Sequence, residues 1–405
     1  MNYDVIVCGA GPAGTTTALF LANAGKKVLI LEKEKFPRDK VCADNKTWKC
    51  LDIVKELGLW KEFTKLPKKE INGVLVASPS GHEMYTPLWE QDVKEKGPWY
   101  NVRREVFDNF LAEACKKNKN IELRERCTVT GPALEGKQVT GVWFKNERGL
   151  EEVTYASIVV AADGSQSPIA NAIGISPQVR GRHALNIRAY YEGVTGASDR
   201  CELYYLKGIC PGYFWIFPVD NHKCNIGLAM RFEDIEKQGT KLEEKLNEVI
   251  QSEKFRDRFK NAKRAGEPKQ WGLSVLGKRR KCSGAGFVLV GDAGTFAMTF
   301  SGEGVGPSMR SGKIAAQAIV NAFDRNNFSA ESLNEYDEML WKVLEPEVKG
   351  FRWLEFLILN ETVFDWVVQR ASKKKELIEL SSRMQNDYSL AQNLVSPRTI
   401  LKLFF

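Results

Sequence analysis

The chain has 405 residues, of which 43% are hydrophobic and 27% charged, enough for one large core and about two to four domains. Its formal net charge of +8 comes without a nucleic-acid recognition motif, so a nucleic-acid partner is not expected, although the charge would suit an anionic membrane surface. It has no run of about 18 apolar residues, no signal peptide and no Cys-x-x-Cys pair, so we expect a cytoplasmic protein with no membrane-spanning helix, disulfide framework or metal centre.

The first predicted unit is a strand, a glycine-rich turn, a helix and a second strand. Residues 3–8 form a short apolar run of the kind that is buried in a parallel sheet. They lead into the sequence GAGPAG at 9–14, which is followed by an alanine- and leucine-rich helical stretch at 15–24. A second apolar run at 27–31 ends at Glu32. This order is that of a Rossmann nucleotide-binding unit.

Each residue of this turn has a physical role in binding a nucleotide. Gly9 permits the tight turn, Gly11 lets the backbone approach a pyrophosphate, and Gly14 lets the helix pack closely on the strand. Pro12 suits the first helical turn, because its missing amide proton would have no helical partner there. The free amides and the positive end of the helix then face the phosphates. Glu32 is placed to accept hydrogen bonds from a ribose hydroxyl.

Two later loops favour FAD over NAD as the nucleotide. The apolar runs 158–162 and 287–290 each lead into a loop with an aspartate, Asp163 and Asp292. An acid at the carboxyl end of a strand lies where α/β sheets contact their ligands. Two such loops, far apart in sequence, therefore indicate an extended cofactor. A further glycine-rich loop at 299–306 opens a predicted helix, whose amides would stabilise the negative charge of reduced flavin.

Together these motifs resemble the hydroxylase-type FAD superfamily, with its glutathione-reductase-like nucleotide fold, and within it the geranylgeranyl reductase family. The resemblance extends over nearly the whole chain. The stretches that carry it are FPRDKVCAD at 36–44, REVFD at 104–108, YFWIFP at 213–218 and SGEGV at 301–305, followed by Ser311-Gly312 and, near the carboxyl end, Pro397-Arg398-Thr399.

The resemblance implies where FAD is held. Its adenosine and diphosphate would lie at the glycine-rich turn, and its ring between the segment after the second strand and the loop that opens the late helix. By similarity, Ala13, Glu32 and Arg104 would contact the diphosphate and adenosine ribose, the backbone of Val129 the adenine, Asp292 the ribityl chain, and Cys42, Ala43, Gly304 and Val305 the flavin ring. The full set of expected FAD-binding residues is Gly9, Gly11, Ala13, Gly14, Glu32, Cys42, Ala43, Arg104, Val129, Asp163, Gly164, Asp292, Gly302, Gly304 and Val305.

Residues 213–218 are expected to form a substrate wall. On a strand, Tyr213, Trp215 and Phe217 project from one face, and an apolar aromatic face suits a long hydrocarbon chain. The alternative is a sheet face that packs on a core. The resemblance places Cys42 and Tyr213 close to the reaction, which makes them the candidate catalytic residues.

The expected fold class is α/β, with a discontinuous glutathione-reductase-like FAD-binding domain, an antiparallel-sheet substrate domain and a carboxyl-terminal helical region. Aromatic residues in that last region would form an apolar face for core packing or for docking on a membrane. The expected members of this face are Trp341, Phe351, Trp353, Phe356 and Trp366. The expected domains are 1–75, 98–176 and 278–327 for FAD, 76–97 and 177–277 for the substrate, and 328–405 for the helices.

The expected reaction is the reduction of carbon–carbon double bonds in a geranylgeranyl or polyprenyl chain, carried by a lipid or another isoprenoid. An isolated alkene is a poor hydride acceptor, so protonation must lead or be concerted. No second glycine-rich dinucleotide motif occurs, so the electrons would come from a donor such as ferredoxin or transiently bound NAD(P)H. The rival functions are a hydroxylase or halogenase on the same scaffold, and an electron-transfer flavoprotein acting on a quinone, which usually adds clustered cysteines for an iron–sulfur centre.

Overall fold

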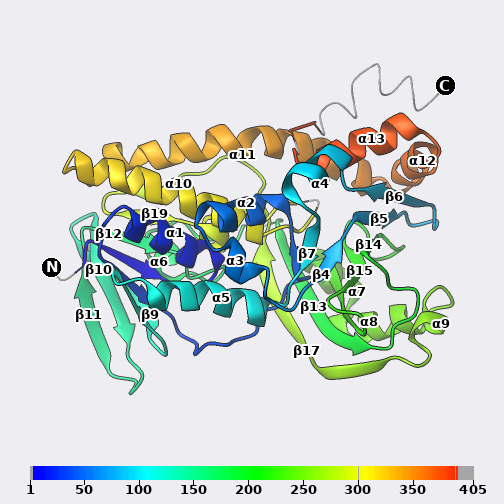
Figure 1. Ribbon diagram of the computed structural model, residues 1–405, viewed down its shortest axis with the longest axis horizontal. Coiled ribbons are helices and arrows are strands. Elements are labelled where there is room, and N and C mark those ends of the chain that lie inside the picture. The colour runs from blue at the N-terminus through cyan, green and yellow to red at the C-terminus, as the bar shows by residue number, and fades with distance from the viewer. Residues whose placement is uncertain (1–2, 180, 300, 388, 391–405) are drawn as a thin grey trace.

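The computed structural model describes residues 3–179, 181–299, 301–387 and 389–390. Two large sheets lie side by side, and two long helices run across the top of the molecule in the view of Figure 1. The combination of a parallel sheet, antiparallel sheets and carboxyl-terminal helices confirms the expected α/β class.

The first sheet has six strands and is parallel except at one edge, where β18 and β19 are antiparallel. Every residue of its central strands is buried, as expected for apolar runs covered on both faces. In β1, Val5 is paired with Ile158 on one side and with Val28 on the other. The strands in sheet order are β18 (Ser283–Gly284), β19 (Phe287–Leu289), β12 (Ile158–Ala161), β1 (Val5–Cys8), β2 (Val28–Leu31) and β8 (Ile121–Arg124).

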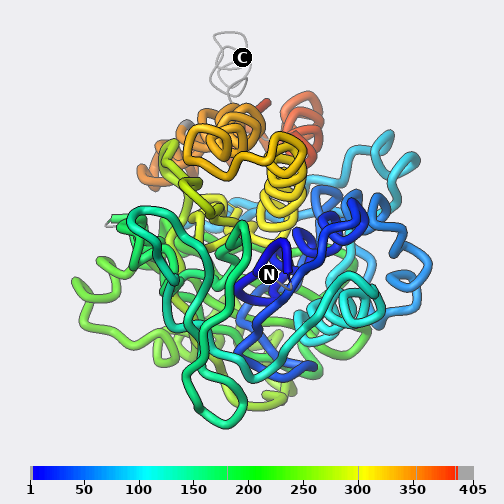
Figure 2. The backbone as a smooth tube through the Cα atoms, turned by 90° about the vertical axis from the view of Figure 1, so that its left-hand side faces the viewer, coloured from blue at the N-terminus to red at the C-terminus, as the bar shows by residue number. Residues whose placement is uncertain are grey.

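Helices α1 (Pro12–Asn23) and α5 (Arg104–Lys117) pack on this sheet, and α10 (Val305–Asp324) packs on α1. The contact between α1 and α10 is very close, because a Cβ atom at Gly312 would lie 2.6 Å from the carbonyl oxygen of Ala13. A small antiparallel sheet adjoins the first one, and Figure 2 shows its teal strands beside the blue amino-terminal segments, with yellow α10 above them. Its strands are β9 (Thr128–Glu135), β10 (Gln138–Lys145) and β11 (Glu151–Tyr155).

The second large sheet has seven strands and joins segments that are far apart in sequence. An early segment, residues 73–87, enters it, since β5 pairs with β14 and β6 pairs with β5. Helix α8 (Leu242–Gln251) packs on one face of the sheet, and the other face borders the site described below. The strands in order are β17 (Lys263–Ser274), β13 (His183–Glu192), β16 (Lys223–Arg231), β15 (Tyr213–Pro218), β14 (Arg200–Tyr204), β5 (Gly73–Ala77) and β6 (Glu83–Pro87).

The remaining elements connect the two sheets. A three-stranded sheet of β3 (Asn45–Lys46), β7 (Trp99–Asn101) and β4 (Lys69–Ile71) carries part of a second apolar core. The exact domain boundaries stay a prediction. The short helices are α2 (Trp48–Glu56), α3 (Trp60–Phe63), α4 (Glu90–Lys96), α6 (Pro168–Ala172), α7 (Phe232–Gln238), α8 (Leu242–Gln251), α9 (Arg256–Phe259) and the 3-10 turn η1 (Gly291–Gly294).

The carboxyl-terminal helices are α11 (Ala330–Leu359), α12 (Glu361–Ala371) and α13 (Lys375–Met384). The expected common aromatic face does not exist along α11: Trp341 and Phe351 are buried in the core of the first sheet, whereas Phe356 is exposed. Leu354 and Ile358, on either side of Phe356 in the sequence, are buried, so Phe356 lies on the outward side of the same helix. The side chain of Trp353 and residues 397–399 lie outside the described residues. No described helix is long and apolar enough to cross a bilayer.

Candidate functional site

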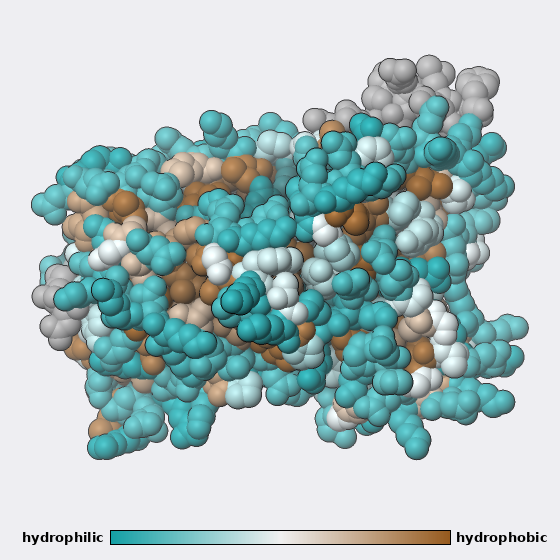
Figure 3. All heavy atoms as spheres, in the orientation of Figure 1, coloured by the Kyte–Doolittle hydropathy of each residue, from teal (hydrophilic) through white to brown (hydrophobic). Residues whose placement is uncertain are grey.

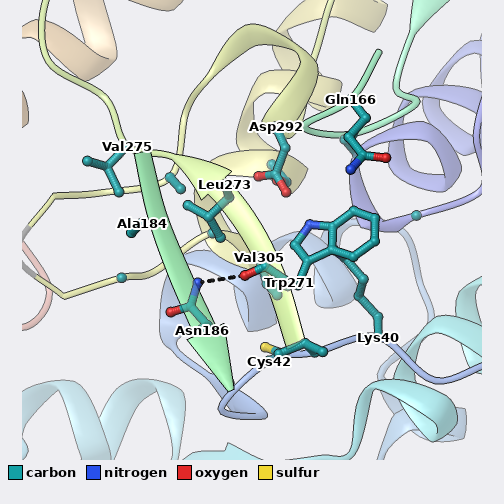
Figure 4. A pocket seen from close by; sticks show the side chains of 18 of the residues that line it. Lys40, Cys42, Gln166, Ala184, Asn186, Trp271, Leu273, Val275, Asp292 and Val305 are labelled. Carbon is teal, nitrogen blue, oxygen red and sulfur yellow. Dashed lines mark hydrogen bonds between the residues drawn. The ribbon is translucent and has the colours of Figure 1, made fainter. Parts of the chain in front are cut away.

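A cavity of about 530 Å³ lies between the carboxyl ends of the parallel strands and the inner face of the seven-stranded sheet (Figure 4). This volume is within the range of about 300–1,000 Å³ that is usual for ligand sites. All of the expected FAD-binding residues line the cavity except Gly14, and of the expected substrate wall Tyr213 and Trp215 line it but Phe217 does not. The topology therefore brings together residues from both halves of the chain.

The glycine-rich turn has the geometry that its sequence predicts. Gly9 has a φ of +100°, and a Cβ atom there would lie 2.6 Å from the carbonyl oxygen of Ala162. At Gly14, which packs the helix on the turn, a Cβ atom would lie 2.0 Å from the carbonyl oxygen of Gly9. Gly11 differs, because its nearest neighbour would be Arg38 at 3.9 Å. Gly11 therefore borders open space at the amino terminus of α1, where a diphosphate can approach the backbone.

Glu32 is held rigidly at the end of β2. Its carboxylate accepts hydrogen bonds from the amides of Ala10 at 2.7 Å and Glu34 at 3.0 Å. The guanidinium of Arg38 approaches the same carboxylate to 3.6 Å. Glu32 therefore orients the glycine-rich turn as well as facing the cavity, a second role that its position in the motif did not reveal.

Two arginines on the cavity wall share one buried carboxylate. Arg104 donates to both oxygens of Asp108, at 2.6 and 2.7 Å, one turn apart on α5. Arg38 donates to Asp108 at 2.9 Å. Burial alone would raise the pKa of Asp108, but the neighbouring Arg104 holds it below its ordinary value. The carboxylate thus stays ionised and fixes both guanidinium groups at the cavity; Arg38 was not among the predicted site residues.

Asp163, at the end of β12, has a carboxylate that lacks a partner. Neither of its oxygens is accessible to solvent or hydrogen-bonded within the described residues. Burial raises the pKa of Asp163 to about 6. Buried polar groups are normally hydrogen-bonded. A hydroxyl group of a bound ribose or ribityl chain would satisfy this carboxylate once a shift of the loop opens its oxygens to the cavity.

Asp292 lies beside the amino terminus of α10. A Cβ atom at Gly304, the residue that caps this helix, would lie 3.9 Å from Oδ1 of Asp292. The positive end of α10 therefore opens into the cavity. The positive end of α1, at the glycine-rich turn, opens into the same cavity. The open space at Gly11, the unpartnered Asp163 and this helix end together fit an extended dinucleotide with hydroxyl groups along its length.

The segment that carries Cys42 is clamped by the seven-stranded sheet. Asn225, on β16, donates from Nδ2 to the carbonyl oxygen of Cys42 and to Oδ2 of Asp44, both at 2.7 Å. Tyr190, on β13, donates its hydroxyl to the same Asp44 oxygen at 2.7 Å. Asp44 has a φ of +71°, in the left-handed region, and its other oxygen accepts the amide of Arg104 at 3.0 Å. This network fixes the position of Cys42 and was not predicted from the sequence.

The aromatic wall is formed by β15. The Trp215 indole lies over Gly227 of the neighbouring strand, where a Cβ atom would be 2.1 Å from the ring, and it donates to Asn225 at 2.8 Å. Tyr213 donates its hydroxyl to the carbonyl oxygen of Ser301 at 3.2 Å, and burial raises its pKa. Phe217 projects from the same side of the strand but packs into the second apolar core. Trp215 belongs to the same core but also lines the cavity, so the cavity reaches two of the three aromatic residues, and their role as a substrate wall stays a prediction.

On the other side of the cavity, β17 contributes Trp271 (Figure 4). Its indole donates to Ser165 at 3.1 Å, and the ammonium of Lys40 lies 3.3 Å from the ring centre. His183 also lines the cavity. Sequence reasoning missed these residues, and no group of three metal-binding side chains occurs in the part of the chain that the structure describes.

Fold and site define an FAD-dependent oxidoreductase, and comparison with known proteins agrees. Residues 2–325 match the FAD binding domain family. Digeranylgeranylglycerophospholipid reductase of Methanosarcina acetivorans is 31% identical over 350 residues, 84% of this chain and 80% of that protein. The chain belongs to the FAD binding domain family and, within it, to the geranylgeranyl reductase family, and its cofactor is FAD.

Solved structures share the fold. A geranylgeranyl bacteriochlorophyll reductase-like protein from Thermoplasma acidophilum has a TM-score of 0.84 at 22% identity, covering 97% of this chain and 98% of that one. The flavin-dependent brominase Bmp2 has a TM-score of 0.81 at 21% identity, covering 100% of this chain and 99% of that one. Because reductase-like and halogenating proteins share this fold, the fold does not choose between reactions.

Proposed function

We propose that the chain saturates carbon–carbon double bonds of a geranylgeranyl or other polyprenyl chain, in isoprenoid or membrane-lipid biosynthesis. The observation that carries the proposal is the continuity of the cavity: residues suited to FAD line one part, and Tyr213 and Trp215 line another. A long hydrocarbon against this wall would have its double bonds beside the flavin. The similarity to digeranylgeranylglycerophospholipid reductases supports the same substrate class.

Reduced FAD, when bound, supplies a hydride. The chain's own residues would hold the cofactor at the amino termini of α1 and α10, exclude water with the aromatic wall and supply a proton. For the proton we favour Cys42 over Tyr213. The Tyr213 hydroxyl donates a hydrogen bond to the carbonyl oxygen of Ser301, and burial raises its pKa. Both effects keep the proton on the tyrosine oxygen. The Cys42 sulfur accepts the amide of Asp44 at 3.4 Å, in the clamped segment beside the cavity.

An anaerobic turnover separates this proposal from its rivals. Chemically reduced protein is mixed with a geranylgeranyl phospholipid, and lipids are analysed by mass spectrometry; oxidised protein is the control. We expect mass gains in steps of two hydrogens together with reoxidation of the flavin. A product that forms only with oxygen and gains an oxygen atom would instead identify a hydroxylase. Reoxidation by a quinone alone would identify an electron-transfer flavoprotein. Replacing the chemical reductant by reduced ferredoxin or by NAD(P)H in this assay tests which of them reduces the flavin.

We propose in addition that the protein takes its substrate from an anionic membrane surface. Support comes from the end of α11, where Ile358 and Leu359 line the cavity and Phe356 is 65% exposed. Exposed aromatic side chains at a lipid-binding opening suit interfacial docking. Most of the face shown in Figure 3 is hydrophilic, so an apolar contact would be local. In vesicle flotation, Phe356→Ser should lose binding to anionic vesicles, whereas Trp143→Ser, at a 42% exposed residue on β10, should not. Equal flotation of both variants would count against docking here.

A further inference from the structure

Lys40 is a buried cation without a hydrogen-bond partner among the described residues. Its Nζ atom is inaccessible to solvent and lies 3.3 Å from the centre of the Trp271 ring. Burial lowers the pKa of Lys40 to about 7. A cation–π contact of this kind stabilises an ammonium group only in part, and a buried charge normally has a charged or hydrogen-bonding partner. The arrangement therefore leaves the charge of Lys40 uncompensated beside the cavity.

The surroundings of Lys40 place it at the end of the cavity where α10 begins. Asp292, which lies beside Gly304 at the start of α10, is the carboxylate with the strongest electrostatic effect on Lys40. The cations Arg38 and Arg104 also face Lys40, but both are bonded to Asp108. Lys40, in contrast, has no ion pair within the described ranges. Figure 4 shows its side chain on the same cavity as Trp271, Cys42 and Asp292.

We propose that the ammonium group of Lys40 faces the redox-active ring of bound FAD and stabilises the negative charge that the ring gains on reduction. Two electrons and one proton convert the neutral oxidised ring into an anionic reduced ring, and Lys40 gives no proton to the ring. In a cavity with little water, a nearby cation stabilises that anion more strongly than in solution. The inference rests on FAD binding and not on the prenyl substrate, so its failure would leave the proposed reaction intact.

The decisive variants are Lys40→Met and Lys33→Met. Lys33 is a matched control, because it also lines the cavity but is exposed to solvent, and its Nζ lies 5.9 Å from the centre of the same Trp271 ring. In the FAD-loaded proteins, the two-electron midpoint potential is measured with a reference dye, and the dissociation constants of oxidised and reduced FAD are measured separately. We expect Lys40→Met to weaken the binding of reduced FAD at least tenfold more than the binding of oxidised FAD. This difference corresponds to a midpoint potential lower by about 30 mV. Lys33→Met should match the unmodified protein.

The pH dependence supplies a second readout. Burial gives Lys40 a pKa of about 7 in the FAD-free protein, so we expect it to be neutral beside the oxidised ring above that pH. It takes up a proton on reduction, so the potential should fall more steeply with pH than in Lys40→Met. The other groups facing it are Asp292, Arg104, Cys42 and Arg38, which all three variants retain. Lys40→Arg, charged at every pH, should keep a high potential without the steeper slope.

Three outcomes would overturn the inference. One is an unchanged potential in Lys40→Met. Another is an equal loss of affinity for oxidised and reduced FAD, which would make Lys40 a contact to the phosphates. If Lys40→Met does not fold or bind FAD, Lys40→Arg decides alone, and a pH slope equal to that of the unmodified protein would refute the role.

Discussion

The unpartnered carboxylate of Asp163 should make the FAD-free protein less stable at neutral pH than at acidic pH. The folded-state pKa is raised from 3.8 to about 6, so the folded protein holds a proton that the unfolded chain has already released. When folding raises the pKa of a carboxyl group, its contribution to the free energy of unfolding is fully present below the unfolded-state pKa. That contribution is lost as the pH rises through the folded-state pKa. A pKa shift of about two units lowers the free energy of unfolding by about 3 kcal/mol at pH 7, and by about half of that at pH 5.

Asp163→Asn removes the charge and keeps the shape. We therefore expect it to raise the free energy of unfolding of the FAD-free protein by about 3 kcal/mol at pH 7.5 and by about half as much at pH 5. Urea unfolding at the two pH values measures this difference. Asp324→Asn, at an exposed carboxylate at the end of α10, is the control and should show neither effect. If Asp163→Asn stabilises equally at both pH values, or not at all, the reasoning from burial is wrong.

Three further substitutions test the site. Glu32→Ala should weaken FAD binding by about 1–3 kcal/mol, because a ribose contact is lost and the Ala10 amide loses its acceptor; FAD titration measures this, and unchanged affinity would remove Glu32 from the site. Trp215→Phe should keep the flavin spectrum but turn over long prenyl substrates poorly, and a loss of FAD and fold together would mean that the wall is only core. Asn225→Ala should release Cys42 and lower turnover more than FAD affinity, whereas equal losses in both would speak against a positioning role.

The sequence could predict the parts of the site that are local. The glycine-rich turn, its flanking strands and Glu32 lie within one short segment, so their spacing already determines their geometry. The loops with Asp163 and Asp292 were predictable for a similar reason, because each follows an apolar run that could only be a buried strand.

What the sequence could not predict depends on contacts between distant segments. Lys40 and Trp271 are brought together by the packing of the two large sheets, and nothing near either residue signals the other. Asn225 did carry a signal, since it is a single amide in an otherwise apolar strand and needed a partner in the core. Phe217 does not line the cavity, because alternation predicts the face of a strand but not how far a cavity extends along it.

The near-contact of α1 and α10 at Gly312 has a consequence for how such proteins diverge. Main-chain atoms set the separation of these helices, so changes in the surrounding side chains leave the distance between their amino termini unaltered. The opposite wall is made of side chains on β15, β16 and β17, each of which one substitution can exchange. One half of the cavity is thus resistant to sequence drift and the other is open to it. Descendants of a common ancestor can acquire new substrates while retaining the same cofactor.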